Sequence, residues 1–122
     1  MLLDNTLDEL TAANKLALAA AKQATQDFIN ARFDGRDGGA CGFAWVTFVP
    51  TYKGNTKLGK QERRMIKSLG FEKNYTGKAY DMWNPSGSYV QSVDAKYAGA
   101  AAYADTMRKE VDVKIFAADR LD

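Results

Sequence analysis

The side chains best suited to hold an anion lie between residues 53 and 78. This segment carries eight Lys or Arg residues against two acidic ones, a net charge of +6, in a chain whose formal net charge is +2. Segregated charge of this kind produces a local positive potential. If a helix begins near Lys57, its N-terminus adds to the attraction for phosphate groups. The candidate anion-binding residues are Lys53, Lys57, Lys60, Arg63, Arg64 and Lys67.

The same segment has an alternative interpretation. Five cations on one side of a helix are also typical of a solvated surface that keeps a protein soluble. Residues 54–60 read Gly-Asn-Thr-Lys-Leu-Gly-Lys, which lacks the spacing of a phosphate-binding P-loop. The segment therefore predicts attraction for an anion and no defined phosphate motif.

A second set of candidate residues forms an aromatic platform. Its members are Trp45, Trp83 and Phe116, with Lys114 placed two residues before Phe116, and Phe43 is an alternative to Trp45. Aromatic rings and a lysine on an open sheet are how some ferredoxin-like modules stack nucleic-acid bases. The Gly-Phe-Gly-Phe type of strand in the RNA-recognition consensus is absent. The alternative is that the N-terminal helix or a second subunit covers these rings.

Residues for catalysis and metal binding are scarce. The chain has no histidine and a single cysteine, Cys41, which excludes a Ser-His-Asp triad and most zinc sites. Cys41 cannot form an internal disulfide, a pattern typical of a reducing compartment. A nucleophilic cysteine also needs a nearby base. We therefore expect no catalytic residue, metal site or cofactor, and an enzyme is the less favoured alternative to a binding protein.

The first half of the chain predicts three elements around these residues. A long helix is expected over 7–32, begun by a capping box of Thr6 and Glu9. An uncharged strand rich in β-branched and aromatic residues is expected over 43–49, central in its sheet and buried on both faces. A second helix is expected over 57–69, because a cationic side and an apolar side alternate at helical spacing.

The second half predicts a hairpin, a helix and a strand. The hairpin joins 71–75 to 79–84, a helix follows over 93–109, and an alternating strand runs over 111–116. Without the first helix, the order is βαββαβ. That order predicts a ferredoxin-like α+β fold, with a four-stranded antiparallel sheet and both helices on one face, plus an extra long N-terminal helix. The other face of the sheet stays open to that helix, to a second subunit or to a ligand.

Length and composition favour one domain over residues 1–122. Within it we expect the N-terminal helix (1–33), a glycine-rich connector (34–42) and the α+β core (43–122). No run of about 18 apolar residues predicts a membrane span. The start of the chain lacks a basic region followed by an apolar stretch. The sequence thus predicts a cytoplasmic protein without membrane contact.

Three strings resemble segments of small accessory proteins encoded by tailed bacteriophages. They are Gly-Ala-Cys-Gly-Phe-Ala-Trp-Val (39–46), Leu-Gly-Lys-Gln-Glu-Arg-Arg (58–64) and Gln-Ser-Val-Asp-Ala-Lys-Tyr-Ala-Gly-Ala (91–100). The resemblance covers about the last two thirds of the chain and carries no catalytic residues. It implies action by binding a host factor, a nucleic acid or a signalling nucleotide, in the host cytoplasm.

The residues and the resemblance together favour a non-enzymatic binding protein. We expect it to hold an anionic partner, a nucleic acid or a phosphorylated nucleotide, on the basic helix face with help from the aromatic platform. The alternative is a protein-interaction module. In that role the chain would form a homo-oligomer, or inhibit a host protein, through its N-terminal helix and its open sheet face.

Overall fold

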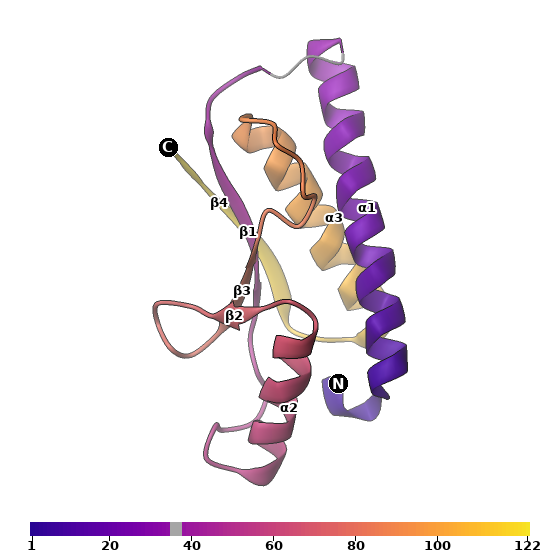
Figure 1. Cartoon of the computed structure of the whole chain (residues 1–122), viewed down its shortest axis with the longest axis vertical. Helices are drawn as coiled ribbons and strands as arrows, with labels where there is room; N and C mark the ends of the chain where they lie inside the picture. Colours follow the sequence, from indigo (N-terminus) through magenta and orange to yellow (C-terminus); the bar gives the residue numbers. More distant parts are fainter. Residues whose placement is uncertain (35–37) are drawn as a thin grey trace.

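Helices and an antiparallel sheet form an α+β fold in the computed structural model, which describes residues 1–34 and 38–122 (Figure 1). A short 3-10 helix over Leu2–Asp4 precedes the main elements. These elements are α1 (Leu7–Phe33), β1 (Gly42–Phe48), α2 (Lys57–Ser68), β2 (Glu72–Lys73), β3 (Tyr80–Trp83), α3 (Val93–Val111) and β4 (Ile115–Leu121). Within the described residues, no helix has the uninterrupted apolar length that a membrane crossing requires.

Local sequence signals fix the start of α1. The Glu9 N–H donates to Thr6 Oγ1 at 3.1 Å, and the Thr6 N–H donates to Glu9 Oε1 at 2.9 Å, so the predicted capping box is confirmed. Hydrogen bonds to the carboxylate from the Thr6 backbone N–H and the Thr6 side chain lower the pKa of Glu9, because they favour its charged form. The helix ends at Asp34, which adopts a left-handed conformation with φ of 51°. Residues 35–37 of the predicted connector lie outside the described part of the chain.

Small residues let α1 and α3 approach each other closely. A Cβ atom at Gly99 of α3 would lie 2.4 Å from Thr25 Oγ1 and 3.0 Å from the Ala21 carbonyl oxygen of α1. Thr25 Oγ1 donates to the Ala95 carbonyl at 2.7 Å. Helix α3 in turn packs against β1 and β4, so it lies between α1 and the sheet (Figure 1). The alanine-rich N-terminal helix therefore covers α3.

The interface of α1 and α3 also contains a buried phenol. Tyr103 is fully buried, and its hydroxyl donates to Asn14 Oδ1. Burial raises the pKa of Tyr103, because the phenolate would lose its hydration. Asn14 Nδ2 donates to the Leu69 carbonyl at 3.2 Å. Asn14 of α1 thus forms hydrogen bonds both to α3 and to the residue that follows α2.

The strand order is β2-β3-β1-β4, and every neighbouring pair is antiparallel. On β1, Ala44, Val46 and Phe48 are buried in the same core as residues of all three helices. Phe43 and Trp45 point to the opposite face, where Phe43 is 38% exposed. The prediction that this strand is buried on both faces was wrong. The reason is tertiary: α1 packs on α3, which leaves the far face of the sheet uncovered.

The last strand begins later than predicted. The prediction placed it over 111–116, whereas α3 continues to Val111 and β4 starts at Ile115. Val111 follows Met107 by four residues and extends the buried side of α3 by one turn. Asp112 then ends the helix in a left-handed conformation, with φ of 49°. The alternating apolar residues of this segment fit both a helix end and a strand start.

The second helix matches its prediction closely, and the hairpin forms within its predicted segments. Thr56 caps α2 by accepting the Gly59 N–H at 2.9 Å, and Gly70 follows the helix with φ of +102°. The hairpin pairs Glu72 with Asp81 and is shorter than predicted. A Cβ atom at Gly59 would lie 1.9 Å from the backbone carbonyl oxygen of the preceding loop. The first turn of α2 therefore packs directly under that loop.

Candidate functional site

The open face of the sheet contains a hollow of about 460 Å³, which we call the aromatic hollow. Strands β1, β3 and β4 supply its floor, and the turn between β2 and β3 supplies one rim. Its volume lies within the range of about 300–1,000 Å³ that is typical of small-molecule sites. The lining residues are Trp45, Asn74, Tyr75, Thr76, Asp81, Trp83, Phe116, Ala118 and Arg120.

Strand register brings the predicted aromatic residues together. Trp45 lies opposite Trp83 on β3 and opposite Ala118 on β4, and Phe116 is two residues from Ala118. Directly opposed residues project from the same face of a sheet. The ring centroids of the two tryptophans are 4.7 Å apart, with their planes inclined by 32°. Trp45, Trp83 and Phe116 thus line one hollow, in which Trp83 is 52% and Phe116 45% exposed.

The cation of the aromatic hollow is Arg120. Lys114, which was predicted to lie beside the rings, is exposed just before β4 begins and does not line the hollow. Arg120 is the fourth residue after Phe116, so the two share a face of β4. Side chains alternate between the two faces of a strand. Continuing that alternation from Phe116 to residue 120 would have placed Arg120 on the face of the rings. The mistaken strand boundary at 111–116 hid it.

A hydrogen-bond network holds the polar rim. Asp81 Oδ1 accepts from Thr47 Oγ1 at 2.8 Å and from Asn74 Nδ2 at 3.3 Å. Asn74 Oδ1 in turn accepts the Thr76 N–H at 3.1 Å. This chain of bonds ties the hairpin turn to the sheet. Tyr75, in the middle of the turn, remains fully exposed at the mouth of the hollow.

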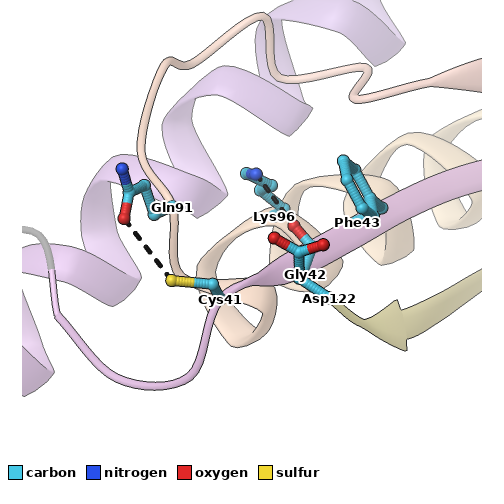
Figure 2. Close-up of a pocket in the computed structure, with 6 residues that line it drawn as sticks. All are labelled: Cys41, Gly42, Phe43, Gln91, Lys96 and Asp122. Carbon is cyan, nitrogen blue, oxygen red and sulfur yellow. Dashed lines mark hydrogen bonds between the residues drawn. The ribbon is translucent and has the colours of Figure 1, made fainter.

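Phe43 and Trp83 connect the aromatic hollow to two further hollows. The second hollow, of about 310 Å³, has Trp83 and Phe43 among its walls. The third, of about 200 Å³, is lined by Phe43 and Lys96 beside the start of β1 (Figure 2). Lys96 Nζ lies 5.7 Å and the Arg120 guanidinium 5.4 Å from the centroid of the Phe43 ring. Both distances are within the range of cation–π contacts.

Cys41 lies in the third hollow, where Figure 2 shows its thiol directed toward Gln91. It is exposed, and its Sγ donates to Gln91 Oε1 at 3.4 Å. Lys96 Nζ donates to the Gly42 carbonyl at 2.9 Å across the same hollow. Among the described residues, no group of three His, Cys, Asp or Glu side chains forms a metal-binding cluster.

Four of the six predicted anion-binding residues form one exposed line along α2, which we call the α2 stripe. They recur every three or four residues, so they share one side of the helix. Opposite them, Ile66 is buried in the core. Leu69, just after the helix, is buried in the same core. The stripe consists of Lys57, Lys60, Arg64 and Lys67.

The other two predicted cations have different surroundings. Arg63 is half-buried, and its Nη1 donates to the Tyr52 carbonyl at 2.9 Å and to the Gly59 carbonyl at 3.0 Å. It therefore fastens the loop before α2 to the helix. Lys53 is exposed in that loop. Buried Glu62 completes the attachment by accepting the N–H groups of residues 51 and 52, each at 3.0 Å.

The α2 stripe and the aromatic hollow are separate surfaces. None of the six predicted cations lines the aromatic hollow or the two hollows beside it. The hollow offers flat aromatic surface with one guanidinium, which suits a planar ring attached to an anionic group. The stripe offers charge alone, which suits a phosphate backbone.

No family model, no curated protein and no solved structure matches this chain.

Proposed function

We propose that the chain is a binding module that holds a planar, negatively charged ligand, a nucleotide or a nucleic-acid segment, in the aromatic hollow. One observation carries the proposal. Both tryptophans of the chain lie side by side in a hollow on the uncovered sheet face, next to Arg120. An unpartnered pair of tryptophans at a surface is costly to hydrate and well suited to stack a heterocycle.

Stacking is expected to supply most of the affinity. A base stacked on an aromatic side chain contributes about 1–3 kcal/mol. The formal charges in the hollow nearly balance, since Arg120 and Asp81 both line it. Arg120 therefore orients one phosphate group, and it does not create a strong positive field. This combination favours ligands that contain both a ring and a phosphate over simple phosphate anions.

We also infer a ferredoxin-like plan for residues 42–121. Read from the β4 edge, the strand order is β4-β1-β3-β2, and all pairs are antiparallel. Helix α2 connects β1 to β2, and α3 connects β3 to β4. Both observations support the split βαβ arrangement. In such a frame the uncovered sheet face is available to a ligand.

Intrinsic fluorescence gives a direct test, because Trp45 and Trp83 are the only tryptophans of the chain. Titration with nucleoside monophosphates should quench or shift the emission and reach saturation. The matched control ligand is inorganic phosphate, which should leave the emission unchanged. A protein whose emission responds to none of the nucleotides, nor to oligonucleotides, would contradict the proposal.

The α2 stripe supports a second, weaker candidate function, the binding of a nucleic-acid backbone. The ion pairs found among the described residues join Met1 to Asp4 and Arg108 to Asp105, so they leave the four stripe cations to solvent. Four phosphate contacts predict a log–log salt dependence of about −3.6 for duplex DNA. A duplex that shows no affinity even at low ionic strength would exclude this role.

A further inference from the structure

We infer that the open face, together with the adjoining edge of β1 beside the start of α3, accommodates a single-stranded nucleic acid that extends across three adjoining hollows, and not only a free nucleotide. This inference rests on the function proposed above and adds the class of ligand. The three hollows follow one another along β1. The aromatic hollow includes Trp45, the second includes Phe43 and Ala44, and the third includes residues 41–43.

An aromatic ring separates each hollow from the next. Trp83 lines both the first and the second hollow, and Phe43 lines both the second and the third. The two rings meet edge to face, with centroids 6.0 Å apart and planes at 77°. The ring of Trp45 also contacts that of Trp83, with centroids 4.7 Å apart. Phe43 and Trp45 of β1, joined by Trp83 of β3, form a cluster of stacking surfaces for successive bases.

A cation accompanies each step along this row. Arg120 lines the first hollow and lies over Phe43, which is a wall of the second. Lys96 lines the second and third hollows and lies over the same ring. Cations at the junctions are placed to contact the phosphates that connect consecutive bases. A free nucleotide would use one of the hollows and leave the other ring surfaces exposed.

The same geometry predicts that the nucleic acid binds as a single strand and not as a duplex. Bases reach aromatic partitions only when they are unstacked from their neighbours and unpaired. The two cations are offset by acidic side chains, Asp81 in the first hollow and Asp122 in the third. The salt dependence should therefore be shallow, with a log–log slope of about −1.4 for two phosphate contacts on a single strand.

The test is a length series of oligothymidylates, from the mononucleotide to the hexanucleotide, measured by quenching of the tryptophan emission. Affinity should rise about tenfold per added nucleotide until the three hollows are filled, and then level off. Equal affinity for the mononucleotide and all longer ligands would overturn this inference and leave the proposed function intact. Failure of every ligand to bind would overturn both.

A pair of variants tests whether the rise of affinity with oligonucleotide length depends on Phe43. Phe43→Leu removes the partition between the second and third hollows, and it should weaken oligonucleotides about tenfold more than it weakens the mononucleotide. Tyr97→Leu is the matched control, because Tyr97 has similar exposure and lines none of the three hollows. Phe43→Tyr should restore the length dependence. Equal losses in the two leucine variants would contradict the inference.

Two further results would show that a different partner occupies this face. Binding of a fully paired duplex as tightly as the single strand would overturn the inference, since paired bases cannot enter the hollows. Sedimentation of the free protein as a dimer, with tryptophan emission shielded until the dimer dissociates, would assign the face to a second copy of the chain and would also overturn it.

Discussion

The aromatic hollow and the α2 stripe differ in the side chains that they present to solvent. The hollow offers two stacked tryptophans and one guanidinium, with its formal charge balanced by Asp81. The stripe offers four exposed cations and no aromatic partner on its side of the helix. A ligand held by stacking is recognised by its bases, whereas a ligand held by charge is recognised by its phosphates. Under the proposed function, the aromatic hollow would discriminate among ligands, and the α2 stripe would concentrate polyanions.

The two surfaces also differ in how they are built. The stripe arises from a helix that local signals define, with Thr56 at its start and Gly70 after its end. The hollow arises from three strands whose residues are far apart in the sequence. A single substitution therefore removes a stripe contact without altering the fold. The hollow depends on the register of the whole sheet.

The largest expected effect is that of Trp83→Leu on ligand affinity. Loss of one stacking ring should weaken nucleotide or single-strand binding about 5- to 150-fold, equivalent to about 1–3 kcal/mol. Titration of the remaining tryptophan emission measures it. The double variant Lys60→Ala/Arg64→Ala, on the α2 stripe, is the control and should keep the original affinity. If the stripe variant loses single-strand binding instead, the assignment of the two surfaces is reversed.

Glu62→Gln should lower the free energy of unfolding by about 2 kcal/mol, because charge-assisted hydrogen bonds to the backbone are lost and an amide donor faces backbone donors. Glu62 is 1% exposed and accepts from residues 51 and 52. Urea unfolding measures the change, with the exposed neighbour Gln61→Ala as the control. The folded variant should retain the affinity of the aromatic hollow. A change in that affinity would indicate that the two surfaces are coupled.

Raising the salt concentration should weaken duplex binding about twentyfold more than oligothymidylate binding. Between 50 and 200 mM salt, duplex binding to the α2 stripe should decline more steeply than oligothymidylate binding to the hollow. Lys60→Ala/Arg64→Ala should reduce the duplex slope from about −3.6 to about −1.8 and leave the oligothymidylate slope unchanged. Identical slopes for the two ligands would mean that they share one surface.

The smallest expected effect is on a region outside both surfaces. Thr6→Ala removes the cap of α1 and should lower the free energy of unfolding by about 1 kcal/mol, with both affinities unchanged. The backbone N–H of residue 6 still lowers the pKa of Glu9, but the variant loses the side-chain partner that lowers this pKa further below its ordinary value of 4.5. A depressed folded pKa stabilises the protein above that value and loses its contribution as the pH falls through the folded pKa. Unfolding measured from neutral pH to about pH 3 should therefore show a steeper loss for the unmodified chain.

Helix positions were predictable because their signals are local. The Thr6–Glu9 capping box, the Thr56 cap and the Ser92 cap all lie within four residues of the groups they satisfy. The boundary between α3 and β4 was mispredicted for the same reason. Val111 fits the buried side of a helix and the buried side of a strand equally well, and only packing on the core selects the helix. Because the strand was predicted to end at residue 116, Arg120 was not recognised as the cation beside the rings.

The capped helices, the cationic side of α2 and the aromatic character of the strands were predictable, since each depends on a pattern over a few residues. Which face of the sheet the aromatic residues share, and that this face is open, depends on packing between distant elements. Alternation along a strand defines two faces, and it does not say which one a helix will cover. Because α1 packs on α3 through Gly99 and Thr25, the face with Trp45 and Trp83 stays open. That choice depends on contacts between residues more than 70 positions apart, which no local pattern encodes.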